Sequence, residues 1–136
     1  MKNLSLLLGR FGLALIFILS GLAKLGAGYA PTQGYMEAMG VPGALLPLVI
    51  AAELGGGLAV LAGLLTRWAS LGLAVFSLAS AVLFHFDLGD QGQFINFYKN
   101  VAIAGGFLVL AAHDGGRLSL DALLSSRRAA AKAVVS

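Results

Sequence analysis

The sequence predicts an all-α protein, a four-transmembrane-helix bundle with both termini in the cytoplasm. Hydrophobic residues make up 59% of the 136 residues and charged residues only 11%, and the mean hydropathy is +0.91. A soluble domain needs a charged surface that this composition does not provide. Four apolar segments each have close to the ~20 residues that cross the hydrocarbon core of a bilayer as a helix. The basic residues concentrate at one end of the spans that these segments define.

The four expected spans follow one another with short polar connections. They are Leu4–Leu25, Gly43–Leu65, Trp68–Phe86 and Phe94–Ala112. The first segment has some features of a secretory signal, but it is longer than a signal core and Arg10 interrupts it, so we interpret it as a retained helix. Pro42 and Pro47 fall at or near the first turn of the second span, where proline is tolerated.

Two segments outside the spans have expected structures. The first connection, Gly26–Pro42, is long, and within it residues 32–39 begin with a plausible cap and predict a short helix. The chain divides into a four-helix membrane domain at residues 1–114 and a basic cytoplasmic tail at residues 115–136. We expect the tail to be a frayed helix near anionic lipid headgroups.

Basic residues predict the orientation in the membrane. If the four spans alternate, six basic residues fall on one side, and by the positive-inside rule that side is the cytoplasm. They are Lys2, Arg67, Arg117, Arg127, Arg128 and Lys132. The pI near 9.6 is therefore explained by topology signals, and we expect the lipid bilayer as partner and no nucleic acid.

Glu53 is the only charged residue in the apolar run Val41–Leu65. A carboxylate at the centre of a span is costly unless it is paired, protonated or hydrated, so it marks a candidate functional site. At 1.5 Å per residue, Arg10 lies roughly 6 Å from Glu53 in depth and Lys24 about 15 Å from it. This arithmetic favours an Arg10–Glu53 pair, either as a structural lock between helices or as part of a site.

A second group of polar residues is expected where the spans meet the periplasmic side. Lys24 closes the first span, His85 closes the third, and Asn96 and Lys99 open the fourth. Together they form a candidate site for an anionic or quinol-like headgroup, with His85 able to exchange a proton near neutral pH. The structural alternative is that the lysines extend toward lipid phosphates and His85 bonds to a backbone carbonyl.

Several kinds of chemistry are excluded or unsupported. The chain has no cysteine, so it cannot itself carry out thiol–disulfide exchange or hold an iron–sulfur cluster. His85 and His113 are expected on opposite sides of the membrane, so they cannot share a haem. No set of histidines and carboxylates has the spacing of a metal site, and no catalytic residue can be named.

Several short motifs resemble, in their order and spacing, those of the DoxX family of small bacterial inner-membrane proteins. They include Gly9-Arg10, Phe17–Lys24, Glu53–Gly56 with Thr66-Arg67, and Phe97–Asn100. The resemblance covers about Leu4–His113 and implies a four-helix inner-membrane protein. It also implies a link to quinone-dependent oxidation, quinone resistance, or a membrane oxidoreductase complex in oxidative-stress defence. The family's polar positions match Arg10, Lys24, Glu53, His85 and Lys99.

Three functions remain open from the sequence. The first is a membrane subunit that binds a quinone or hydroquinone as its possible cofactor, beside soluble or membrane oxidoreductase subunits. In it Glu53 or His85 accepts the proton, while a partner or the quinone provides the redox capacity. The second is a non-catalytic scaffold or assembly protein for an oxidoreductase complex. The third, less favoured because four helices enclose little lumen, is transport of protons or small solutes.

Overall fold

The computed structural model describes residues 1–135, which contain six α-helices, two short 3₁₀ turns and no β-strand. The helices are α1 (Lys2–Ala23), α2 (Tyr29–Ala38), α3 (Leu46–Ala62), α4 (Thr66–Phe84), α5 (Gln91–His113) and α6 (Leu120–Val135). The four segments that are long and apolar enough to cross a membrane are Lys2–Ala23, Gly43–Ala62, Thr66–Phe84 and Gln91–His113. They confirm the predicted all-α, four-span fold.

Helix ends differ from the expected ones where polar residues form the first turn. The fourth span begins at Gln91 instead of Phe94, because the Asp90 side chain caps the helix and accepts a hydrogen bond of 2.8 Å from the Gln93 backbone N–H. A span predicted from hydropathy does not include such a polar turn, although the cap stabilises the turn as part of the helix. Between α3 and α4 the chain reverses tightly through Gly63 and Leu65, both with positive φ.

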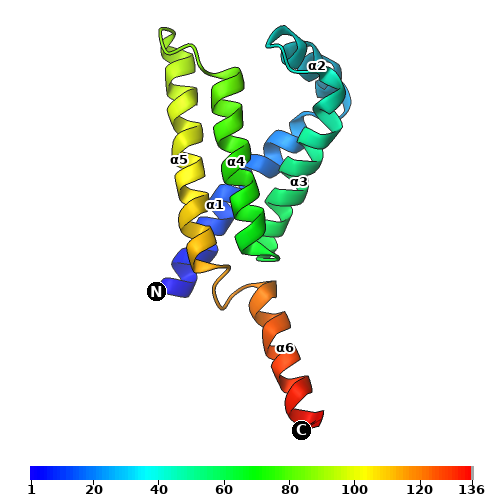
Figure 1. Ribbon diagram of the computed structural model, residues 1–136, viewed down its shortest axis with the longest axis vertical. Helices are drawn as coiled ribbons and strands as arrows, with labels where there is room; N and C mark the ends of the chain where they lie inside the picture. The colour runs from blue at the N-terminus through cyan, green and yellow to red at the C-terminus, as the bar shows by residue number, and fades with distance from the viewer. Residues whose placement is uncertain (136) are drawn as a thin grey trace.

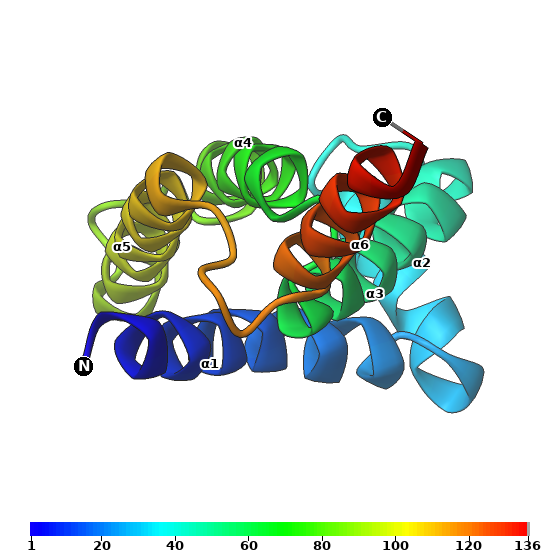
Figure 2. The ribbon, with the colours of Figure 1, turned by 90° about the horizontal axis from the view of Figure 1, so that it is seen from below.

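The four long helices form a closed bundle in which α1 packs chiefly against α3 and α4 against α5 (Figure 1). Contacts between α3 and α4 and between α1 and α5 complete the ring. Seen from below, α1 runs obliquely across the other long helices (Figure 2). The N and C termini lie at the same end of the molecule. We call this the terminal end; its assignment to the cytoplasm stays a prediction.

A packed apolar core occupies the middle of the bundle. It contains residues from all four long helices: Ala14, Phe17, Val60, Leu73, Ala74, Ala104, Phe107 and Leu110. The Phe17 ring meets the rings of Phe76 and Phe107 edge-on, at centroid distances of 6.0 and 5.4 Å. Large apolar side chains on the outside remain exposed, as lipid-facing positions require.

The long first connection folds over the opposite end of the bundle from the termini, which we call the α2 end. Its helix, α2, covers residues 32–38 of the expected segment and begins three residues earlier, at Tyr29. Thr32, the expected cap, therefore lies inside the helix, where its hydroxyl donates to the Gly28 carbonyl. Met36 is buried against Leu46 and Ile50 of the second span, forming a second small core. In this way α2 forms one wall of the space between the helices at that end.

The tail is tied to the bundle at its beginning. Asp121 accepts hydrogen bonds from the Leu65 and Thr66 backbone N–H groups and from the Thr66 hydroxyl, at 2.8, 2.9 and 2.9 Å. The Asp121 N–H donates to the Gly63 carbonyl. From there α6 extends away from the four long helices, as Figure 1 shows. The last residue of the expected tail, Ser136, lies outside the described residues.

Candidate functional site

A partly buried ion pair joins Lys24, at the C-terminal end of α1, to Glu53 of α3. The Lys24 Nζ atom lies 3.0 Å from Oε1 and 2.9 Å from Oε2 of Glu53. The side chain of Glu53 is only 6% exposed and that of Lys24 is 20% exposed. Ser20 completes the group, because its hydroxyl donates to Glu53 Oε1 at 3.0 Å and accepts from Lys24 at 2.6 Å. The carboxylate is thus paired with a cation and a hydroxyl.

One oxygen of this carboxylate keeps an unused hydrogen-bonding position. Although Glu53 Oε2 is close to the ammonium of Lys24, it accepts no aligned hydrogen bond from any residue that the structure describes. The short distance therefore reflects charge attraction, and the lone pairs of Oε2 stay available. A buried acceptor in this state favours a ligand or water that donates to it.

The expected Arg10–Glu53 pair is wrong. Arg10 is 2% exposed and its guanidinium donates instead to the carbonyls of Gly115 and Leu118, at 3.0 and 2.7 Å. It therefore holds the connection between α5 and α6 at the terminal end. Arg10 takes no part in the group around Glu53.

The register between α1 and α3 explains the error. A Cβ placed on Gly21 would lie 3.3 Å from the Glu53 Cβ atom, so these residues face each other. Lys24 is one helical turn beyond Gly21 and reaches Glu53 directly. Depth counted along a helix perpendicular to the membrane fails here, because α1 runs obliquely to the other long helices.

The ion pair lines a cavity of about 740 Å³ at the α2 end of the bundle. Five of the six residues that the sequence predicted for a site lie around this cavity: Lys24, Glu53, His85, Asn96 and Lys99. Apolar walls come from α1, α3, α4, α5 and the α2 segment, including Phe17, Met36, Val49, Phe76, Leu83 and Ile103. The carboxylate is therefore adjacent to open space instead of being sealed in the core.

At this cavity, His85 is held by a neighbour from the next helix. Its Nδ1 atom lies 2.7 Å from the Gln93 side-chain oxygen, so a proton on Nδ1 donates to Gln93 and leaves Nε2 as the acceptor. This differs from the backbone contact of the structural alternative. Lys99 is exposed, and neither its ammonium nor the Asn96 side chain forms a hydrogen bond or ion pair within the described chain.

Sequence reasoning missed several polar residues of the cavity. Ser20 is the most important, and Thr32, Tyr35, Ser80 and Asn100 also line the space. Serine in an apolar helix ordinarily bonds to its own backbone, so its presence alone carries little information. The available signal was the four-residue spacing between Ser20 and Lys24, which places both on one helix face.

This arrangement suits hydrogen bonding and proton exchange with a mostly apolar ligand. Volumes of ~300–1,000 Å³ and apolar walls with few convergent polar groups are typical of small-molecule sites. The polar groups offer an ammonium donor, a carboxylate acceptor and an imidazole. No group of three or more His, Cys, Asp or Glu side chains in residues 1–135 is placed to hold a metal ion.

Comparison with known proteins agrees with the membrane fold. The sequence profile of the DoxX family matches residues 5–86. The chain is 46% identical over 127 residues to the inner membrane protein YqjF of Escherichia coli K12, covering 93% of this chain and 97% of that protein. It is 37% identical over 123 residues to the inner membrane protein YphA of the same organism, covering 85% and 87%. No solved structure matches the chain. The chain therefore belongs to the DoxX family and is a multi-pass protein of the bacterial inner membrane.

Proposed function

We propose that the cavity at the α2 end binds a quinone or hydroquinone, and that the protein serves as a membrane subunit in redox or oxidative-stress defence. One observation carries the proposal: the Lys24–Glu53–Ser20 group, with its buried carboxylate, faces an open, largely apolar cavity. A pair that served only to lock α1 to α3 would gain nothing from that opening. The family relationship is consistent with this function without establishing it.

The residues present fit such a ligand. Aromatic and aliphatic walls match a ring with an apolar tail, and the unused lone pairs of Glu53 Oε2 match a phenolic hydroxyl. The Lys24 ammonium already donates to Ser20 and Glu53 and holds the carboxylate in place. The Lys99 ammonium lines the same cavity without a partner in the described chain, and it matches a ring oxygen. The cavity thus offers both an acceptor and a donor to the ring oxygens.

When bound, a quinone would supply the two-electron redox chemistry that the side chains lack. Glu53 Oε2 would accept a hydrogen bond from a hydroquinone hydroxyl and take its proton as the ring is oxidised, and Lys24 holds the carboxylate ionised until that transfer. His85 would exchange protons at Nε2 near the α2 end. Because the chain has no cysteine, we assign the electron transfer to a soluble or membrane oxidoreductase partner.

Recovery of bound quinone tests the proposal. The protein is purified from membranes in mild detergent, and extracted quinones are quantified by mass spectrometry and absorbance. We expect quinone with the native chain, and roughly tenfold less with Glu53→Gln, because a charged hydrogen-bond partner contributes about 1.5–3 kcal/mol. Glu37→Gln is the matched control, since Glu37 is an exposed carboxylate outside the cavity lining.

A native chain that carries no quinone, and takes up none when it is added, would contradict the proposal. That result, together with recovery of a stoichiometric protein partner, would favour the non-catalytic scaffold. Transport by a single copy is not favoured, because the core containing Phe17 and Phe107 lies between the two ends of the bundle.

A further inference from the structure

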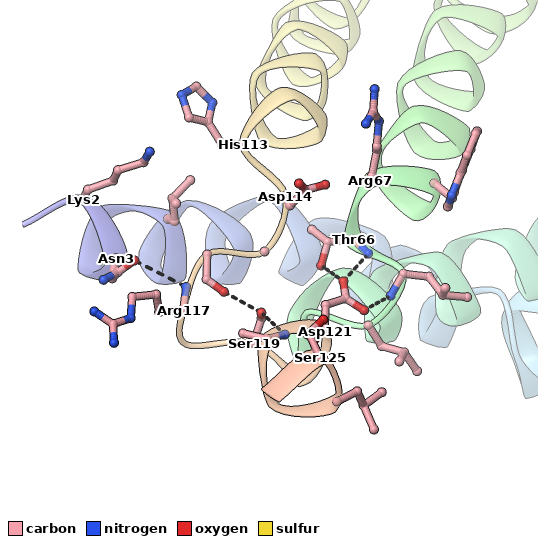
Figure 3. A pocket seen from close by; sticks show the side chains of 18 of the residues that line it. Lys2, Asn3, Thr66, Arg67, His113, Asp114, Arg117, Ser119, Asp121 and Ser125 are labelled. Carbon is pink, nitrogen blue, oxygen red and sulfur yellow. Dashed lines mark hydrogen bonds between the residues drawn. The ribbon is translucent and has the colours of Figure 1, made fainter. Parts of the chain in front are cut away.

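A second cavity, of about 820 Å³, lies at the terminal end of the bundle (Figure 3). Four segments far apart in the sequence surround it: the start of α1, the α3–α4 turn, the connection after α5, and α6. It shares no lining residue with the cavity that holds Glu53. The proposed function makes no use of it.

The connection that forms one wall of this cavity is held from inside the bundle. Arg10 binds the Gly115 and Leu118 carbonyls, and Ser119 bonds to the Gly116 carbonyl at 2.6 Å. Asp121 then fixes the start of α6 on Thr66. Because hydrogen bonds to the bundle anchor both ends of this wall, the cavity is a built feature and not a gap beside a loose tail.

Cationic side chains dominate the lining. Lys2, Arg67, Arg117 and Arg128 line the cavity against two carboxylates, Asp114 and Asp121. None of these four cationic side chains makes a hydrogen bond or ion pair within residues 1–135, whereas Asp121 is occupied with Thr66 and Leu65. In Figure 3 Lys2 and Arg117 lie on the α1 side and Arg67 on the α4 side. The cavity therefore carries an excess of unneutralised positive charge.

The position of the cavity relates this charge to lipid headgroups. It lies where the apolar helices α1, α4 and α5 begin or end, next to Trp68, which is 70% exposed. Exposed tryptophan at the end of a spanning helix is typical of the headgroup region. Clustered basic residues at this level attract anionic lipids.

We propose that this cavity binds a phosphate group, carried either by an anionic phospholipid headgroup or by a soluble phosphate ester. Arg128 from α6 and Arg117 from the connection approach the phosphate from the tail, and Lys2 and Arg67 approach it from the bundle. Arginine suits this role because its planar fork donates to two phosphate oxygens at once. Bound phosphate would join α6 to the membrane end of the bundle.

Trp68 offers a direct test, because it is the single tryptophan of the chain and lines the cavity. The protein is reconstituted with phosphatidylcholine, and brominated phosphatidylglycerol or brominated phosphatidylcholine is titrated in as a quencher of Trp68 fluorescence. The ratio of the quenching by brominated phosphatidylglycerol to the quenching by brominated phosphatidylcholine gives the preference for the anionic headgroup. A second arm titrates glycerol phosphate into protein in unbrominated phosphatidylcholine and follows the Trp68 emission.

Arg128→Gln and Arg127→Gln form a matched pair, since both remove one charge from exposed positions of α6 and only Arg128 lines the cavity. We expect Arg128→Gln to lower the preference for phosphatidylglycerol about fivefold, Arg127→Gln to leave it nearly unchanged, and Arg128→Lys to restore most of it. A saturable, Arg128-dependent response to glycerol phosphate without a lipid preference would instead identify a soluble phosphate ester as the ligand. The proposal is overturned if neither arm responds, or if both glutamine variants lower the preference equally.

Discussion

At the residue scale, the group around Glu53 shows how a membrane-spanning helix tolerates a carboxylate. Lys24 and Ser20 both contact Oε1, and Oε2 stays within 2.9 Å of the ammonium. Both partners come from one face of α1, four residues apart, so a single helix supplies the charge and the hydroxyl. The pair is adjacent to a cavity, which lets the same residues be structural in the absence of a ligand and functional in its presence.

Removing one member of the pair should cost more than removing both. Lys24→Met leaves a buried carboxylate with only Ser20, and we expect it to lower the free energy of unfolding by about 1.5–3 kcal/mol. The double variant Lys24→Met, Glu53→Leu should recover at least half of that loss, because no unpaired charge remains. Unfolding in detergent, followed by circular dichroism, is measured for the native chain, for each single variant (Lys24→Met and Glu53→Leu) and for the double variant. Strictly additive effects would show that the two side chains are not coupled.

At the element scale, the tail is attached to the bundle by Arg10, which the sequence predicted to pair with Glu53, and by Asp121, for which the sequence made no prediction. Arg10 from the first span holds the connection after α5, and Asp121 caps the start of α4. Gly63 permits this approach, because its φ of 71° suits glycine and a Cβ there would collide with Arg10 and Ser119. The first turn of the tail is therefore a packed part of the membrane domain's surface.

Acid should detach α6 from the bundle. Burial alone would raise the pKa of Asp121, but the hydrogen bonds from Thr66 and Leu65 and the charge of Arg10 outweigh it, so the pKa lies below its ordinary 3.8. A carboxyl whose pKa is lowered in the folded state stabilises that state at every pH above its ordinary pKa. This stabilisation is lost as the pH falls through the pKa of the folded state. Docking should thus be intact above about pH 5 and be lost progressively below the ordinary pKa.

Trp68 fluorescence against pH measures this detachment, since Trp68 lies two residues from Thr66. The native chain should show an acid transition in emission that Asp121→Asn lacks. Asp114→Asn serves as the control, because Asp114 lies in the same cavity without capping α4. An identical transition in the Asp121→Asn chain would contradict the assignment.

At the scale of the whole molecule, two cavities occupy opposite ends of one bundle and a packed core separates them. The positive-inside rule predicts that the termini, and with them the cationic cavity, lie in the cytoplasm. The cavity at the α2 end would then open toward the periplasmic side. Sidedness therefore decides which compartment each cavity serves.

Single cysteines can establish the orientation, because the native chain has none. A membrane-impermeant maleimide should label Gly89→Cys, in the connection between α4 and α5, in intact spheroplasts. Ser126→Cys, on the exposed part of α6, should be labelled only after the membrane is opened. The reverse pattern would show that both cavities face the compartments opposite to those predicted.

The number of spans, their approximate limits and the short helix after the first span could be read from the sequence, because hydropathy, length and capping are local properties. The sequence also shows which residues are too polar to face lipid. The residues found in this way include Lys24, Glu53, His85, Asn96 and Lys99. Ser20 was not found, since nothing in one helix shows that its hydroxyl bonds to another helix.

By itself, then, the sequence determined an inner-membrane, four-helix chain with a few costly polar side chains inside it, since burial in lipid leaves almost no other way to satisfy the backbone. Only the tertiary structure decided that Lys24, and not Arg10, pairs with Glu53. The oblique path of α1 and the register that places Gly21 opposite Glu53 determine which cation pairs with the carboxylate. Helix tilt and register arise from packing between segments distant in the sequence, so no count along a single helix could supply them.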